Sequence, residues 1–226
     1  MKLILSGFPE ALDLGSDAVS VLEIHNRTLF SRVCQSLFSE LDDEALEPYA
    51  FWDDDERRSS RNQFLFVFNP FALPWSERVL IGEVLQRVEG MFLSEDDVRQ
   101  EIETAGRTLS ERVAALGLRL QSDYAFDVQW EMRKYLKAFD FSVDVDSSDT
   151  LLDNLIKFLK FASDASFKKQ LVFVNLKNFL ETEEVQEFYR QAIFSELNVL
   201  LLENVPDGAS FEFERKMCID KDFLQS

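Results

Sequence analysis

Two unbroken apolar runs restrict the fold of this chain more than any other feature of its sequence. "LVFV" at residues 171–174 and "NVLLLENV" at 198–205 do not alternate between apolar and polar residues. Val, Leu and Phe runs of this length are typical of strands buried on both faces, as in parallel sheets. Residues 183–196 between the two runs have the apolar spacing of a helix. The three segments therefore predict a βαβ unit with parallel neighbouring strands.

The order of the remaining elements predicts an α/β fold with a helical insertion. Further strands are expected at 2–5, 18–24, 63–68 and 211–219, the first of them at a sheet edge. Helical spacing fills the middle of the chain, at 76–92, 96–120, 132–139 and 151–159. The regular series at 96–120 is typical of a coiled-coil seam and needs a partner helix, which 132–139 or 151–159 could supply. We expect an α/β head from residues 1–92 and 166–226 and an α-helical leg from 93–165.

Nucleotide chemistry is disfavoured by the residues around the expected strand ends. Many nucleotide hydrolases end such a strand in a metal-binding Asp, whereas this chain has Asn175. No G-x-x-x-x-G-K-[ST] segment occurs, and the strand that contains Glu23 leads into a helix without a glycine. The single histidine, His25, has no cysteine close to it in sequence, which argues against zinc and against histidine-based nucleophilic catalysis. We therefore expect no bound nucleotide and no enzymatic activity.

The formal net charge of −18 argues against nucleic acid as a partner when it is taken alone. At physiological salt, however, charges are screened over about 8 Å, so a local group of basic residues can attract phosphate although acidic residues lie farther away. Three such groups are candidates for contact with a phosphate backbone, independently of sequence because no base-reading motif is present. They are Arg57, Arg58 and Arg61; Arg133, Lys134 and Lys137; and Lys157, Lys160, Lys168 and Lys169. Each group also has a simpler interpretation as the solvated face of a helix or loop.

Two acidic segments could bind a metal. The acids of 144–153 lack the glycine and terminal Glu of a calcium loop, so we expect Thr150 and Asp153 to cap the next helix. Asp123, Asp127 and Glu131 are spaced by four residues and would share a helix face, where a hard cation such as calcium would relieve their repulsion.

No apolar run reaches the roughly 20 residues that cross a bilayer. The first ten residues do not have the pattern of a secretion signal. We expect a soluble cytoplasmic protein without a membrane partner.

Four stretches resemble a known family: "SVLEIHNRTLFSRVCQSL", "LVFVNLKNFLETEEV", "LNVLLLENV" and the ending "CIDKDFLQS". In order and spacing they are similar to the CRISPR-associated adaptation protein of subtype II-A systems, the short form of the Csn family. The resemblance extends over essentially the whole chain, although the helical middle matches in pattern more than in residues.

This resemblance implies a specific fold and role. The head would resemble a phosphate-loop NTPase core that has lost its phosphate loop. Four copies would form a ring with a basic hole that encircles double-stranded DNA, entered at a free end. The family acts in spacer acquisition with the CRISPR integrase complex and the RNA-guided effector nuclease, and no catalysis is implied. Calcium would support the ring, with Glu23 as a ligand and Asp123, Asp127 and Glu131 in the acidic hinge, where this chain is poorer in acids.

Two other classes of function stay open from the sequence. The chain could be a degenerate nucleotidase-like enzyme with an unrecognised site. It could also be an acidic protein-interaction module that does not bind DNA.

Overall fold

The structure is a computed structural model that describes residues 1–53, 56–122, 124 and 130–225. It divides into two compact units: a head unit of Met1–Trp75 with Asp144–Ser226, and an arm unit of Ser76–Val143. This division differs from the boundaries expected from the sequence, 92/93 and 165/166. The helix that begins at Arg78 falls in the arm unit, and the helix at Leu151–Asp164 falls in the head unit, where it packs on its neighbour α6.

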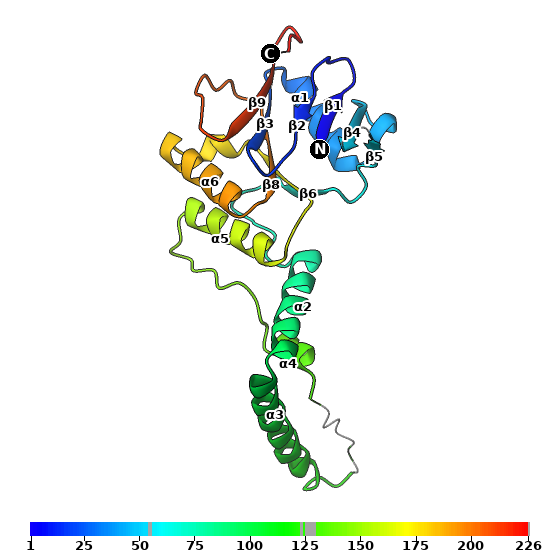
Figure 1. Cartoon of the computed structure of the whole chain (residues 1–226), viewed down its shortest axis with the longest axis vertical. Coiled ribbons are helices and arrows are strands. Elements are labelled where there is room, and N and C mark those ends of the chain that lie inside the picture. The colour runs from blue at the N-terminus through cyan, green and yellow to red at the C-terminus, as the bar shows by residue number, and fades with distance from the viewer. Residues whose placement is uncertain (54–55, 123, 125–129, 226) are drawn as a thin grey trace. The chain divides into compact units, whose positions relative to one another are not determined.

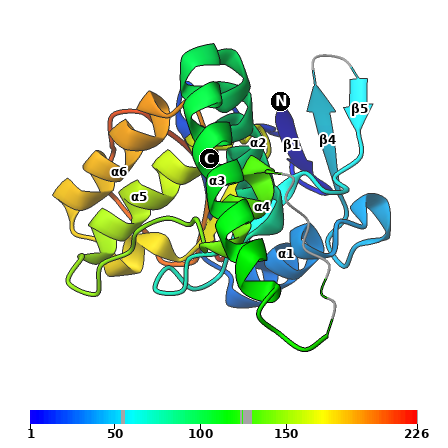
Figure 2. The same ribbon diagram turned by 90° about the horizontal axis from the view of Figure 1, so that it is seen from below.

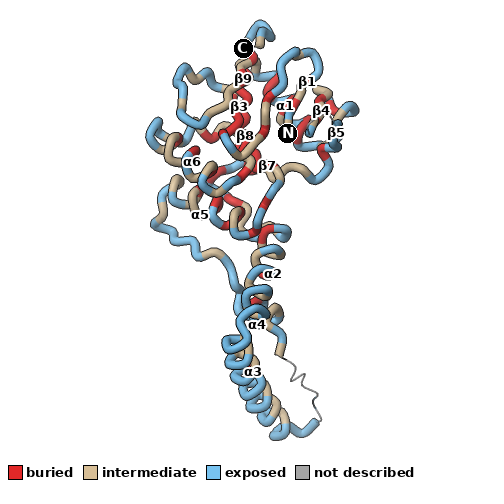
Figure 3. The backbone as a smooth tube through the Cα atoms, in the orientation of Figure 1, coloured by how far each residue is buried: buried red, intermediate tan, exposed pale blue. Residues whose placement is uncertain are grey.

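The head unit is built on a five-stranded parallel sheet, so the predicted α/β class is confirmed (Figure 1). Its strands, in spatial order, are β6 (Phe64–Val67), β7 (Gln170–Val174), β8 (Asn198–Glu203), β3 (Val19–Ile24) and β9 (Glu214–Ile219). Strands β7 and β8 are parallel neighbours joined by α6 (Thr182–Phe194), as the two apolar runs predicted. All six residues of β3 are buried, as expected for a strand between two others (Figure 3).

Different elements cover the two faces of this sheet. Alternate residues such as Leu22 and Leu200 pack on α1 (Arg27–Ser39) and on a small antiparallel sheet. Phe173 contacts Phe188 of α6 on the other face, where α6 lies beside α5 (Leu151–Asp164), as Figures 1 and 2 show.

The small sheet contains, in spatial order, β2 (Leu12–Asp13), β1 (Lys2–Leu5), β4 (Tyr49–Asp53) and β5 (Glu56–Arg58). A 3₁₀ turn at Asp42–Glu44 precedes β4 in the chain. The expectation that residues 2–5 form an edge strand is wrong, because β1 pairs with both β2 and β4. The charged segment at 42–62 includes β4 and β5, which pair antiparallel.

The arm unit contains α2 (Arg78–Ser94), α3 (Asp96–Gly117) and α4 (Met132–Ala138). The apolar seam of α3 is largely exposed: Val98 is 41% exposed and Leu116 57%. The partner helix expected for this seam is therefore not found along it among the described residues. At Gly106, in contrast, a β-carbon would come within 2.2 Å of the Trp130 ring, so that close approach requires glycine.

Candidate functional site

The carboxyl ends of the parallel strands bring together polar side chains from distant parts of the sequence. Glu23 of β3 lies opposite Glu203 of β8 and opposite Cys218 of β9 in the register. Successive side chains of a strand point to opposite faces of the sheet. Leu22, Leu202 and Met217 pack on the α1 face. The residues that follow them, Glu23, Glu203 and Cys218, therefore point toward the α6 face. Ligand sites of parallel α/β sheets lie at this end of the strands.

Asn175 has a structural role at the end of β7. Its backbone is left-handed, with φ of 54° and ψ of 36°. Its N–H donates to Leu202 O at 2.8 Å, and its Oδ1 accepts from Asn204 N at 3.1 Å. Asn is among the residue types that tolerate this conformation. The side chain therefore fastens the end of β7 to the end of β8.

The connection from β3 to α1 has no room for a phosphate loop. Only His25 and Asn26 separate the two elements. Asn26 Oδ1 accepts from the N–H groups of Thr28 and Leu29, at 3.1 and 3.0 Å. These are the donors that a helix N-terminus offers to a phosphate, and here the cap occupies them.

Lys177 is the centre of a buried ion cluster beside these strand ends. It lies on a 3₁₀ turn, Leu176–Phe179, and its side chain is 9% exposed. Its ammonium contacts Asp207 at 2.9 Å and Glu214 at 2.5 Å, and Tyr189 donates to the same Glu214 oxygen. Buried charges are stable only when they are paired in this way. Burial, and then the charge of Glu214, raise the pKa of Tyr189 above its usual value.

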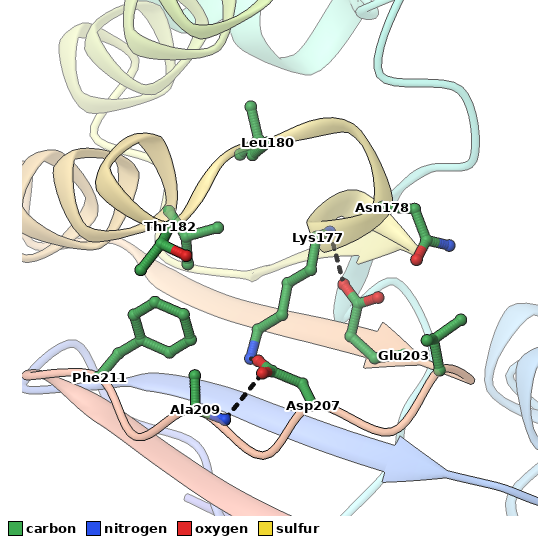
Figure 4. A pocket seen from close by; sticks show the side chains of 10 residues that line it. Lys177, Asn178, Leu180, Thr182, Glu203, Asp207, Ala209 and Phe211 are labelled. Atoms are coloured by element: carbon green, nitrogen blue, oxygen red, sulfur yellow. Dashed lines mark hydrogen bonds and ion pairs between the residues drawn. The ribbon is translucent and has the colours of Figure 1, made fainter.

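A cavity of about 170 Å³ opens next to this ion cluster (Figure 4). Lys177, Glu203 and Asp207 line it together with apolar groups such as Phe211. Burial raises the pKa of Glu203 to about 7, although the N–H of Lys177 donates to its carboxylate at 3.1 Å. Asp207 has a lowered pKa, because hydrogen bonds from Ala209 N and Lys177 outweigh its burial.

Glu23, His25 and Cys218 form a second cluster, which we name the Glu–His–Cys cluster. Glu23 Oε1 lies 2.6 Å from His25 Nε2 and 3.7 Å from Cys218 Sγ, and Sγ lies 3.5 Å from Nε2. The absence of a nearby cysteine in sequence was the reason to set zinc aside. That reason fails in the folded chain, because β9 pairs with β3 and brings Cys218 to His25 across 193 residues.

The basic residues expected to contact DNA lie on different elements of the two units. Arg57 and Arg58 are on β5, with Arg61 just after it; Arg133, Lys134 and Lys137 are on α4; Lys157 and Lys160 are on α5, with Lys168 and Lys169 just before β7. Within the head unit, β5 and α5 lie on opposite sides in both views (Figures 1 and 2), so their basic residues do not share one surface of the unit.

Several of these cations already have acidic partners. Arg57 pairs with Asp43, Lys134 with Glu131 and Lys157 with Asp149. Arg58 lies 3.0 Å from Glu56, and Arg133 donates to Gly82 O. Among the described residues, no ion-pair partner lies within 4.0 Å of Arg61, Lys137, Lys160 or Lys168, which are all exposed. These four are better placed to neutralise phosphate than the candidates that already have acidic partners.

The surroundings of Glu23 do not fit calcium. This cation takes six to eight oxygen ligands, whereas Glu23 faces a ring nitrogen, a sulfur and the ammonium of Lys216 at 3.6 Å. Of the other expected ligands, Asp123 and Asp127 lie outside the described residues. Glu131 is bound to Lys134 at 2.7 Å in the arm unit.

Among the acids of residues 144–153, Asp153 caps the helix α5, as predicted, whereas Asp149 pairs with Lys157. Thr150 and Asp153 form a reciprocal capping box at the start of α5. Asp146 accepts from the N–H and the hydroxyl of Ser148.

No helix among the described residues is both long enough and apolar enough to cross a bilayer.

Comparison with known proteins places the chain in a family. The family model described as CRISPR-associated protein (Cas_Csn2) matches residues 42–223. A solved structure, the crystal structure of Stu0660 of Streptococcus thermophilus, is similar with a TM-score of 0.59 at 16% identity, covering 97% of this chain and 74% of that chain. That likeness supports the α/β fold with helical insertions. No curated protein matches the sequence. Because the family model covers well over half of the sequence, this chain belongs to the Cas_Csn2 family of CRISPR-associated proteins.

Proposed function

We propose that this protein acts in CRISPR adaptation as a non-catalytic homotetrameric ring that encircles double-stranded DNA at free ends. Membership of the Cas_Csn2 family carries the CRISPR-associated role. The ring and its DNA come from the resemblance of the sequence to the adaptation proteins of subtype II-A systems. On the same basis we propose the integrase complex and the RNA-guided effector nuclease as its partners during spacer acquisition, in the cytoplasm.

The non-catalytic part of the proposal is supported by the strand ends of the head. Asn26 occupies the N-terminus of α1 with its own side chain, and Asn175 uses its amide to join β7 to β8. Neither position offers the glycine-rich loop or the metal-binding acid of a nucleotide hydrolase. A sheet of nucleotidase type would here serve as a scaffold.

DNA binding would be electrostatic and independent of base sequence. Exposed lysines such as Lys137, Lys160 and Lys168 would contact phosphates, whereas most of the 42 acidic residues would face away from the DNA. Counterion release makes such binding fall steeply with rising salt.

Calcium support of the ring is proposed for the acidic segment of Asp123, Asp127 and Glu131. Clustered carboxylates repel one another, and a bound hard cation removes this repulsion. Glu23 is left out of this set because its surroundings supply nitrogen and sulfur.

Two measurements test the ring. The mass of the protein in solution should be that of four chains. At equal salt, the protein should be retained on a linear duplex and not on a covalently closed circle of the same sequence, because a closed ring threads only over an end. Equal retention on both forms would exclude threading, and a monomer in solution would remove the basis of the ring.

The same experiments separate the other two classes of function. An acidic interaction module would leave both DNA forms unbound at low salt. A degenerate nucleotidase would bind or turn over nucleotide above the background of a head-unit variant.

A further inference from the structure

We infer that the Glu–His–Cys cluster is a binding site for a borderline transition-metal cation, with zinc as the ion that fits best. The site is distinct from the DNA-binding proposal and does not depend on it. It consists of Glu23 Oε1, His25 Nε2 and Cys218 Sγ, which all lie within 4.8 Å of one another.

The spacing of these three atoms is close to that of a tetrahedral site. Zinc binds sulfur at about 2.3 Å, and nitrogen and oxygen at about 2.0–2.2 Å, so ligand atoms lie about 3.3–3.7 Å apart. Sγ is 3.5 Å from Nε2 and 3.7 Å from Oε1. The Nε2–Oε1 distance of 2.6 Å is a hydrogen bond and must open by about 0.7 Å, which is a small side-chain rotation.

The same geometry excludes a Cys–His–acid relay. In such a relay the thiol and the carboxylate contact different nitrogens of the imidazole. Here both Glu23 and Cys218 approach Nε2 of His25. Three ligand atoms that converge on one point match coordination of a shared ion.

The second oxygen of Glu23 is already engaged. Oε2 accepts from Asp207 N at 3.2 Å and lies 3.6 Å from the ammonium of Lys216. Lys216 is in turn held by the carbonyl oxygens of Asp207 and Ala209. These contacts orient the carboxylate so that Oε1 alone faces the site, and they place the lysine charge on the far side of the carboxylate. Neighbours that fix a ligand in this way are typical of metal sites.

The ligand set determines which ion would bind. One thiolate, one imidazole and one carboxylate suit zinc and similar cations, whereas calcium requires many oxygens. Side-chain exposure of 17% at His25 leaves access for water as a fourth ligand. Binding would release the thiol proton, and Nε2 would bind the ion as the unprotonated nitrogen of a neutral imidazole. It would also fasten β9, at the edge of the five-stranded sheet, to its neighbour β3.

Metal titration of the full chain tests the site. Cobalt(II), a spectroscopic substitute for zinc, should bind with one equivalent per chain and give a thiolate-to-cobalt charge-transfer band that zinc abolishes. Zinc should raise the melting temperature, and calcium should not do so through Glu23. Cys218→Ser and His25→Gln should lose the band and the zinc-induced shift. Cys34→Ser removes the other cysteine, on α1, and should retain both.

A second measurement uses the native protein and does not require a folded variant. Zinc should protect Cys218 from alkylation, as mapped by peptide mass, and chelation should restore its reactivity. A cobalt complex without the thiolate band, unchanged metal uptake in Cys218→Ser, or equal alkylation of Cys218 with and without zinc would each overturn the assignment. A failure of DNA binding in the same preparation would leave these readouts unaffected.

Discussion

At the scale of single residues, burial links the charge of Glu203 to folding. Its carboxylate lies at the end of the central strand β8 and is 1% exposed. Burial disfavours the charged form and raises the pKa to about 7, compared with 4.5 in an exposed side chain. The hydrogen bond from Lys177 N only partly offsets this effect.

Glu203 is therefore expected to make the head less stable as pH rises. Below pH 4.5 the carboxyl is protonated in both states. Between 4.5 and about 7 only the unfolded chain releases its proton, so the free energy of unfolding falls by a total of about 3 kcal/mol and then levels off. Glu203→Gln stays neutral and should gain stability over the native protein across that interval. Urea unfolding at several pH values with a chelator present measures this, and exposed Glu212→Gln is the matched control. A Glu203→Gln advantage that does not change with pH would contradict the linkage.

Most polar contacts of the candidate site could not be predicted from sequence. Glu23 was expected at the end of its strand, and the capping pair at Thr150 was predicted because both members lie within one helical turn. The proximity of Cys218 to His25 depends on which strand pairs with β3, and an alternating segment such as β9 does not encode its neighbour. Lys177 was missed because its acidic partners lie 30 and 37 residues away.

At the scale of elements, the ends of β7 and β8 show how one side chain joins two strands. Asn175 combines a left-handed backbone with a side-chain bond to Asn204. The two contributions can be separated by substitution, because glycine tolerates positive φ and alanine does not.

Asn175→Ala should lose both contributions, about 2 kcal/mol of unfolding free energy in total. Asn175→Gly should lose the side-chain hydrogen bond and keep an unstrained turn. Its loss of unfolding free energy should therefore be roughly 1 kcal/mol smaller than that of Asn175→Ala. The greater backbone entropy of glycine in the unfolded chain reduces this difference. Denaturant unfolding of both variants measures the difference. Equal destabilisation would mean that the left-handed backbone carries no strain at this position.

Strands with unbroken apolar runs were predicted well, since burial on both faces leaves a clear signal. The edge assignment of residues 2–5 failed because the two-residue strand β2, which covers β1, is too short to be recognised. The seam of α3 was identified correctly as apolar, but its spacing does not specify whether the partner lies in the same chain.

At the scale of the whole molecule, the distribution of charge matters more than its sum. The chain carries 42 acidic and 24 basic residues. Arg57 and Lys157 are already neutralised by neighbouring acids, whereas Lys137 and Lys160 are exposed without an ion-pair partner among the described residues. Only an exposed cation without an acidic partner can exchange its counterions for phosphate without first breaking an ion pair.

Lys160→Gln and Lys137→Gln are therefore expected to weaken DNA binding for all sequences alike. Each lost phosphate contact should reduce the slope of log affinity against log salt by about 1. Arg57→Gln, which removes a charge already paired with Asp43, should change the slope little. Affinity for a linear duplex measured over a salt series gives these slopes. A larger change in Arg57→Gln than in Lys160→Gln would show that exposure does not determine the contacts.

The position of β3 in the sheet order has a consequence for how the protein is made. This strand is synthesised early, yet its two neighbours, β8 and β9, lie at residues 198–203 and 214–219. The whole helical insertion leaves the ribosome between them. β3, which is apolar along most of its length, therefore waits for nearly 180 residues of translation before it can pair. Sheets closed by such distant partners fold slowly and expose aggregation-prone surface in the meantime. The time at which residues 198–219 emerge thus determines when β3 can be covered on both sides in a nascent chain.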